Sequence, residues 1–234
     1  MRAQSYQTMA HGADTIQFFQ LRRSLGGCEK FHGAVIEHVG TTETRVFREV
    51  AQLGQELTQL SEIIGTKNVA KVGLVFDWDT YWALEYTSGP NQDLYYVDQI
   101  HHYYRYFYER NIAVEMVAPT DDFSEFELVV APVCYMVKEG VKEAIEQFVQ
   151  AGGTFVTTFM SGIVDQSDNV HLGGYPGPFR KLAGIWVEEI DALAPSQENT
   201  IQLNDGTQGK STLLADIILS LIHISEPTRR VVIS

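Results

Sequence analysis

The sequence predicts an α/β protein in two parts: one strand–loop–helix unit of an α/β barrel, followed by an open, doubly wound parallel sheet. In residues 1–66 a short apolar run and a polar loop stand between two helical patterns. From residue 67 onward, short apolar runs alternate with amphipathic segments of helical length. Because parallel strands must be joined by crossover connections, usually helices, this alternation indicates a parallel sheet.

The first part begins with a helix predicted over residues 2–11, which a turn at Gly12 ends. Residues 15–20 are rich in β-branched and aromatic side chains, so they predict a buried strand. A polar loop that holds three glycines follows over residues 22–33. In an α/β barrel the loops that follow the strands carry the chemistry, so this loop is the candidate site.

A second helix is predicted over residues 42–64, because apolar residues recur there at spacings of three and four. Thr42 or Thr44 can accept a hydrogen bond from the first helical turn. Residues 65–68 end the helix and mark the predicted domain boundary. The apolar stripe consists of Val46, Val50, Leu53, Leu57 and Leu60.

The second part is predicted to alternate strands with helices as far as residue 159. Runs that are apolar throughout are typical of strands covered on both faces. The predicted helix over residues 91–110 has an apolar face that includes His101, so we expect His101 in a core or an interface. The predicted strands are 71–76, 113–117, 127–130 and 154–159, and the other predicted helix is 138–150.

Composition and charge argue against several kinds of partner. The chain is 44% hydrophobic and 20% charged, which is typical of a globular protein. Its formal net charge of −13 would repel nucleic-acid phosphates and anionic lipids, so neither nucleic acid nor membrane is expected as a partner. Cys28 and Cys134 lie far apart in the sequence, which favours a reducing cytoplasm over an oxidising compartment.

Glu29 and His32 are the candidate ligand-binding residues of loop 22–33. A carboxylate can accept hydrogen bonds from two adjacent hydroxyls, and an imidazole can donate or accept one. Such groups suit a neutral sugar, which offers no charge to bind. Arg22 and Arg23 can supply further donors or pair with Glu29. The alternative interpretation is a solvated loop that contains one structural ion pair.

Three blocks of sequence resemble the family-42 β-galactosidases. Residues 10–34, with Phe19, Arg22 and the run 27–34, are similar to the eighth barrel strand of that family and the loop after it. Residues 76–85 read Phe-Asp-Trp-Asp-Thr-Tyr-Trp-Ala-Leu-Glu and resemble a second block of the family, and residues 152–165 resemble a third. The blocks occur in the family's order, and the resemblance covers about residues 1–215.

This resemblance implies a retaining glycosidase that hydrolyses terminal non-reducing β-D-galactose residues of galactosides or galacto-oligosaccharides in carbohydrate catabolism. It implies that Glu29 and His32 bind galactose hydroxyls and that Phe19 lines the same pocket. Both catalytic glutamates of the family, and its cysteine zinc cluster, would lie upstream of Met1. The chain alone is therefore expected to be an inactive fragment with no catalytic residue, no metal and no cofactor of its own.

The resemblance also implies a division of the chain into two domains, and assembly as a homotrimer. Residues 1–66 would be the last strand–loop–helix unit of a TIM (β/α)8 barrel, and residues 67–218 a β-galactosidase trimerisation domain. Residues 219–229 resemble the translation of a transposon sequencing adapter, so residues 219–234 are expected to be a non-native read-through tail. Trp78 and Trp82 either belong to a loop that caps and packs, or wall the active site of a neighbouring subunit.

Cys134 raises a rival interpretation. The second domain resembles the flavodoxin-like sheet of class I glutamine amidotransferases, which carry a nucleophilic cysteine at a strand-to-helix corner. Cys134 is predicted at such a corner, but Val133 and Tyr135 stand beside it where that sharp turn needs small residues. We therefore expect a structural thiol. The rival function is a non-catalytic, amidotransferase-like interaction or ligand-binding domain, which would leave Phe19, Glu29 and His32 unexplained.

Overall fold

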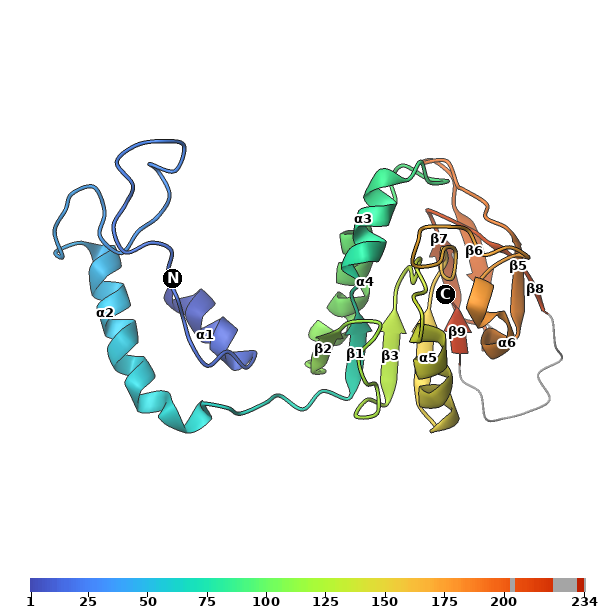
Figure 1. Cartoon of the computed structure of the whole chain (residues 1–234), viewed down its shortest axis with the longest axis horizontal. Helices are drawn as coiled ribbons and strands as arrows, with labels where there is room; N and C mark the ends of the chain where they lie inside the picture. Colours follow the sequence, from blue (N-terminus) through green and yellow to red (C-terminus); the bar gives the residue numbers. More distant parts are fainter. Residues whose placement is uncertain (203–204, 221–230, 234) are drawn as a thin grey trace. The chain divides into compact units, whose positions relative to one another are not determined.

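The computed structural model describes residues 1–202, 205–220 and 231–233. The chain divides into two compact units, Met1–Val69 and Ala70–Ser234, which are called unit 1 and unit 2 below (Figure 1). Among the described residues, none of the helices has the length and hydropathy that crossing a membrane requires.

Unit 1 consists of two helices, a short 3-10 helix and a long loop. Helix α1 (Arg2–Ala10) and helix α2 (Arg45–Leu57) are confirmed close to the predicted ranges, and η1 (Thr58–Ile63) continues α2. Thr44 is the N-cap of α2, because its Oγ1 accepts a hydrogen bond from the Phe47 N–H at 3.2 Å. Leu53, in the middle of the predicted apolar stripe, is 1% exposed.

Two hydrogen bonds to one carboxylate join α1 to α2. Glu56 accepts from the Arg2 guanidinium at 2.6 Å and from the Tyr6 hydroxyl at 2.7 Å. These bonds keep the pKa of the Glu56 carboxyl below its ordinary value, with the Tyr6 hydrogen bond as the largest cause. Unit 1 is thus held together by polar contacts as well as by Leu53.

The strand predicted over residues 15–20 is wrong for this chain. The segment has no regular secondary structure and forms no strand pairing with the described residues. Ile16 and Phe18 are partly buried, whereas Phe19 is 72% exposed. The alternation of a strand is therefore present without a neighbour to supply the hydrogen bonds that define one.

Unit 2 is built on a parallel sheet in the order β2-β1-β3-β4-β9. Residue pairs such as Val72 with Val114 and Val72 with Leu128 set its register, and every strand pair in it is parallel. The four predicted strands are confirmed in position. The strands are β1 (Val72–Val75), β2 (Val114–Val117), β3 (Leu128–Ala131), β4 (Thr154–Thr157) and β9 (Val231–Ile233).

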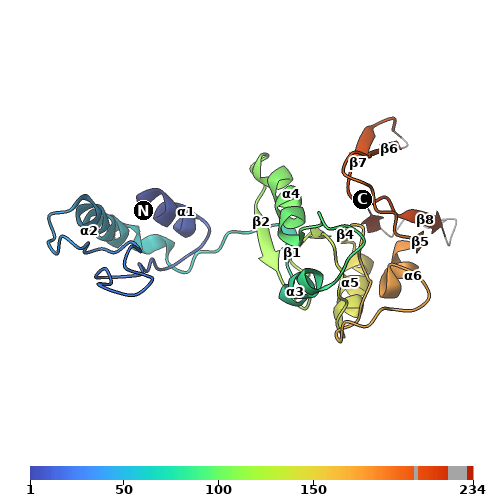
Figure 2. The same ribbon diagram turned by 90° about the horizontal axis from the view of Figure 1, so that it is seen from above.

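Helices cover both faces of this sheet. Alternate residues of β1 and β3 point to opposite sides: Val130 packs in the cluster with α4 (Tyr96–Tyr108), and Val129 packs in the cluster with α5 (Val141–Gln150). Figure 2 shows α4 and α5 on opposite sides of the sheet. The shorter helices are α3 (Trp78–Tyr86), η2 (Gly177–Phe179) and α6 (Arg180–Ala183).

Three expectations for these helices are corrected. The core placement of His101 is wrong, because His101 is exposed and the buried face of α4 is made by Tyr96, Ile100 and Phe107; its placement in an interface stays a prediction. Residues 78–86, expected in one interpretation as a loop, form helix α3. The helix predicted from residue 91 begins only at Tyr96, since residues 91–95 contain a turn and lead into the helix.

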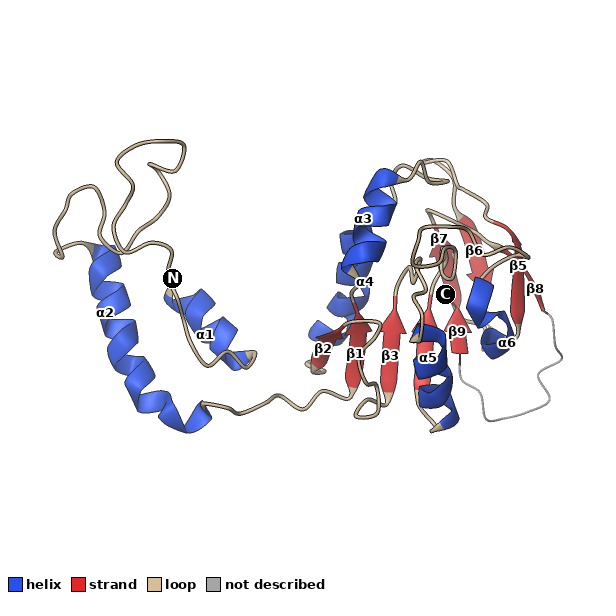
Figure 3. Cartoon of the chain, viewed as in Figure 1, coloured by secondary structure: helices blue, strands red, loops and turns tan. Residues whose placement is uncertain are grey.

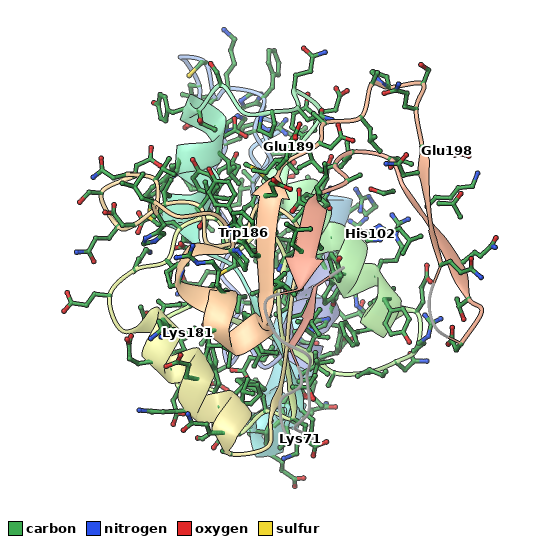
Figure 4. All side chains as sticks on the ribbon, turned by 90° about the vertical axis from the view of Figure 1, so that its right-hand side faces the viewer. Lys71, His102, Lys181, Trp186, Glu189 and Glu198 are labelled. Carbon is green, nitrogen blue, oxygen red and sulfur yellow. The ribbon has the colours of Figure 1, made fainter. Side chains whose placement is uncertain are left out.

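The remaining described strands form two antiparallel pairs. Strand β5 (Ile185–Glu189) pairs with β8 (Ile217–Ser220), and β6 (Asn199–Gln202) pairs with β7 (Gln208–Ser211). Figure 4 shows Trp186 on β5 and Glu198 at the β6–β7 arm, where Glu198 pairs with Lys210 at 2.6 Å. Of the predicted read-through tail, residues 221–230 and 234 lie outside the described residues; residues 219 and 220 belong to β8, and 231–233 form β9.

Candidate functional site

The loop between α1 and α2 is closed on itself by backbone hydrogen bonds (Figure 3). The Val35 N–H donates to the Gln20 carbonyl at 2.9 Å, and the Ile36 N–H donates to the Leu21 carbonyl at 2.7 Å. The Arg23 N–H returns a bond to the Ile36 carbonyl at 3.0 Å. Residues 20–23 and 35–36 thus form the hydrogen-bonded base of the loop, and this base closes the loop formed by residues 24–34.

Glu29 and His32 lie in one turn at the far end of this loop. The His32 N–H donates to the Glu29 carbonyl at 2.9 Å, and both residues are exposed. Within the described part of the chain, neither side chain makes a hydrogen bond or an ion pair. Both polar groups are thus held near one another by the backbone and left available to a ligand.

Arg23 holds the turn in place, which the sequence did not reveal. Its Nε donates to the His32 carbonyl at 2.8 Å, and its Nη1 pairs with the Glu37 carboxylate at 2.8 Å. One expectation was that Arg23 pairs with Glu29. Arg23 pairs with Glu37 instead. The loop contains one structural ion pair, but that pair leaves Glu29 free.

Phe19 lies directly before the paired base of the loop. The peptide bond between Phe19 and Gln20 is cis, and the Gln20 carbonyl accepts the hydrogen bond from Val35. The Phe19 ring is 72% exposed. The three predicted site residues thus belong to one loop system, in which Glu29 and His32 share a turn and Phe19 stands at the base.

A second polar cluster lies where β1 and β3 end. Asp77 caps α3: its Oδ1 accepts from the Asp79 N–H, and its Oδ2 accepts from the Thr80 N–H, each at 3.3 Å. Lys138 approaches Asp77 Oδ1 at 2.7 Å and Asp79 Oδ2 at 2.5 Å. The Asp77 side chain is 8% exposed. This cluster fastens α3 to the sheet edge, as the capping interpretation expects.

Cys134 lies beside this cluster and is buried. Burial, and secondly the charge of Asp77, raises the pKa of the Cys134 thiol to about 12. Its N–H donates to the Ser161 hydroxyl at 3.0 Å. The left-handed residue of the corner is Val133, with φ of 48°, and not Cys134. A nucleophilic cysteine needs a thiolate on the sharp turn, so Cys134 fits a structural thiol.

Among the described residues, no group of three or more histidine, cysteine, aspartate or glutamate side chains could hold a metal ion.

The fold and the site define an α/β protein in which a parallel-sheet unit follows a helical unit with an exposed polar loop. A family model described as "Beta-galactosidase trimerisation domain" matches residues 70–228, and one described as "Beta-galactosidase" matches residues 1–60. The chain belongs to the family-42 β-galactosidases.

Known relatives agree with this assignment. Beta-galactosidase LacZ of Lactobacillus acidophilus is 53% identical over 219 residues, which cover 93% of this chain and 33% of LacZ. Beta-galactosidase BgaA of Planococcus sp. is 54% identical over 226 residues, which cover 95% of this chain and 33% of BgaA. The chain spans about a third of the length of these relatives.

Solved structures show the same similarity. The crystal structure of the β-galactosidase from Bacillus circulans sp. alkalophilus matches with a TM-score of 0.88 and 52% identity, over 94% of this chain and 33% of that one. Gan42B, a β-galactosidase of the same glycoside hydrolase family, matches with a TM-score of 0.84 and 38% identity, over 93% of this chain and 32% of that one.

Proposed function

We propose that this chain is part of a retaining β-galactosidase that removes terminal non-reducing β-D-galactose residues in carbohydrate catabolism. The proposal is carried by the Glu29–His32 turn, which presents two unpaired polar side chains in a segment that matches the β-galactosidase family. Both groups suit the hydroxyls of a neutral sugar. The substrate would be a β-galactoside or a galacto-oligosaccharide.

In this proposal each residue has a separate role. The Glu29 carboxylate accepts hydrogen bonds from two adjacent hydroxyls, and His32 donates to or accepts from a third. The Phe19 ring lies against an apolar face of the sugar. Arg23 positions the turn through the His32 carbonyl. These groups bind and orient galactose but form no bond to it.

The chemical step belongs to two glutamates that we place upstream of Met1. Retention requires one carboxylate to attack the anomeric carbon and another to protonate the leaving oxygen, with the two about 5 Å apart. In this scheme residues 1–66 complete the TIM barrel as its last strand–loop–helix unit. Residues 15–20 would become a strand once their barrel neighbours supply hydrogen bonds.

Residues 67–218 would form the trimerisation domain of a cytoplasmic homotrimer. The strand order β2-β1-β3-β4, with helices on both faces, supports a doubly wound, flavodoxin-like sheet related to that of class I glutamine amidotransferases. The match of residues 70–228 to a trimerisation domain supports the assembly. Residues 219–234 remain a proposed read-through tail.

The first prediction concerns the chain alone. The purified 234-residue chain should release no chromophore from a chromogenic β-galactoside, because in this proposal the nucleophile and the acid are not among its residues. The measurement compares it with a heat-treated sample. Turnover clearly above that background would show that a catalytic pair lies within this chain and would refute the placement of the glutamates.

The second prediction concerns the enzyme completed with its upstream barrel. Glu29→Ala and His32→Ala should each lower kcat/KM about 10- to 100-fold, since a hydrogen bond that involves a charged group is worth about 1.5–3 kcal/mol. Glu43→Ala is the matched control, because Glu43 is an exposed carboxylate of unit 1 outside the loop. If the double variant of Glu29 and His32 cleaved galactosides as fast as the control, the binding role would be wrong.

A further inference from the structure

The tip of the arm formed by β6 and β7 carries an aspartate followed by a glycine. Gln202 pairs with Gln208 at the end of the two strands, and Asp205 and Gly206 lie in the turn between them. Asp205-Gly206 is the only Asp-Gly sequence in the chain, which contains no Asn-Gly sequence. Both residue types are common in hairpin turns because they tolerate left-handed backbone. The pair therefore suits the turn, and it also brings together two groups that can react with one another.

The Asp205 side chain is folded along the backbone of this turn. Its Oδ1 accepts a hydrogen bond from the Thr207 N–H at 2.8 Å, which is the local turn that aspartate side chains commonly make with the residue two positions further on. The carboxyl group therefore reaches past the peptide bond that joins Asp205 to Gly206. Its carbon atom, Cγ, is held beside the Gly206 nitrogen, with which it can close a cyclic imide.

The described part of the chain leaves this nitrogen open to attack the carboxyl group. Gly206 has a φ of 86°, and a side-chain carbon added there would meet no described atom within 4 Å. Asp205 and Gly206 are exposed, and Figures 2 and 4 show the arm projecting from the rest of unit 2. None of the described residues from 199 to 211 belongs to the two buried apolar clusters. Solvent water therefore also reaches the Asp205 carboxyl group.

We propose that Asp205 isomerises to isoaspartate through a cyclic imide formed with Gly206. The Gly206 nitrogen attacks Cγ of the protonated Asp205 carboxyl group. The N–Cγ bond forms, the nitrogen loses its proton, the carboxyl group loses its hydroxyl, and one water leaves. One water from solvent then opens the imide. Cleavage of the new N–Cγ bond restores aspartate, whereas cleavage between the nitrogen and the main-chain carbonyl carbon of Asp205 gives isoaspartate.

Two other aspartates make the same local hydrogen bond and show what the glycine adds. Asp122 Oδ1 accepts from the Ser124 N–H at 2.9 Å, and Asp165 Oδ1 accepts from the Ser167 N–H at 2.8 Å. A phenylalanine that is 3% exposed follows the first aspartate, and a glutamine follows the second. Their side chains hinder the approach of the carboxyl carbon to the next nitrogen, which a glycine does not. These two sites should therefore stay unmodified while Asp205 reacts.

The reaction should be slow in neutral solution. Hydrogen bonds from the backbone N–H and then from the side chain of Thr207 keep the pKa of the Asp205 carboxyl below its ordinary value. Only the small protonated fraction can lose a hydroxyl, so the product should build up over weeks. Isoaspartate adds one carbon atom to the main chain at the tip of the arm. Because the tip lies outside the buried clusters, the midpoint of urea unfolding should not change.

Peptide mapping of the whole chain tests the proposal without any measurement of enzymatic activity. The purified chain is kept for several weeks in neutral buffer at physiological temperature and is then digested with trypsin. Electron-transfer fragmentation locates isoaspartate at each site. Isoaspartate at residue 205 should exceed that at residues 122 and 165 about tenfold or more, which corresponds to about 1.4 kcal/mol of activation free energy. A peptide lighter by one water should precede it, and ageing in heavy-oxygen water should add one heavy oxygen atom.

Two variants test the two reacting groups separately. Gly206→Ala should lower the yield of isoaspartate about tenfold, because its methyl group hinders the nitrogen. Asp205→Glu keeps the charge but moves the carboxyl carbon one bond further away, so no isomer should form at that position. Absence of isoaspartate at residue 205, equal amounts at residues 122, 165 and 205, an undiminished yield in Gly206→Ala, or a product without heavy oxygen would each overturn the proposal.

Discussion

At the scale of single residues, the corner after β3 shows why Cys134 is chemically quiet. The backbone places Val133, and not Cys134, in the left-handed conformation that a nucleophile elbow gives to its reactive residue. Burial keeps the Cys134 thiol protonated, with a pKa raised to about 12. The residues that a reactive thiol needs around it are therefore not assembled.

The third prediction follows from this raised pKa. The unfolded thiol has the ordinary pKa of 9.0, so the unfolded chain loses the proton of Cys134 at lower pH than the folded chain does. Stability from this group is complete below pH 9 and falls as the pH rises from 9 towards 12, by at most about 1.4 kcal/mol per pH unit. Urea unfolding at several pH values measures this fall in the free energy of unfolding.

Two cysteine variants test whether Cys134 causes this decline in stability. Cys134→Ala should flatten the decline in stability above pH 9, whereas Cys28→Ser should leave the decline intact, since Cys28 is exposed. In the native protein at pH 8, a thiol reagent should titrate Cys28 alone. Rapid modification of Cys134 without unfolding would contradict the structural role.

The sequence could predict which residues of the loop carry chemistry, but not what positions them. Glu29 and His32 were identifiable from their types and spacing. Arg23 was not distinguishable from Arg22, because the choice depends on backbone pairing between residues 20–23 and 35–36. Only the folded loop brings Glu37 within 2.8 Å of one arginine.

At the scale of elements, α3 depends on a single buried carboxylate. Asp77 accepts two backbone hydrogen bonds at the start of α3 and also pairs with Lys138. Its N–H donates to the Tyr96 hydroxyl at 3.0 Å, which links the cap to α4. The position of Trp78, the residue that follows, is set by this arrangement.

The fourth prediction is that Asp77→Ala destabilises the protein by about 2–4 kcal/mol, because it removes an N-cap and leaves Lys138 without its less exposed partner. Asp79→Ala is the matched control: the Asp79 side chain is 51% exposed, so its loss should cost less than about 1 kcal/mol. Urea unfolding followed by circular dichroism compares the two. Equal losses would show that the cap does not hold α3.

Helices and strands with a clear hydrophobic periodicity could be predicted from the sequence. A strand that depends on neighbouring strands could not. The stripe of α2 and the apolar runs of β1 to β4 appear where the sequence places them. Residues 15–20 have a strand's composition, but no described strand pairs with them. The core alternative for His101 was wrong because α4 is rich in aromatics all round, so several faces look apolar.

At the scale of the whole molecule, the two units differ in how much they bury. The buried residues of unit 1 are Ser5, Ala34, Val35 and Leu53, whereas unit 2 holds two extensive apolar clusters. A segment with few buried apolar contacts opens locally at low cost. The division into units was visible in the sequence as a change of pattern near residues 65–68.

The fifth prediction uses this difference. Trypsin should cut the chain first after Arg22, Arg23 and Lys30, in the exposed loop, and much later after Lys138 and Lys142, which lie at the cap of α3 and in α5. Mass spectrometry of a time course identifies the order. Simultaneous cutting in both units would mean that unit 2 opens as readily as unit 1.

Strand β2 stands at the margin of the parallel sheet, and among the described residues no strand pairs with its outward backbone groups. Glu115, in the middle of that strand, is exposed. A charged side chain on a short outermost strand discourages foreign strands from adding to the sheet, which protects the protein against amyloid-like stacking. Strand addition at this edge is therefore disfavoured when copies of the chain meet at high concentration.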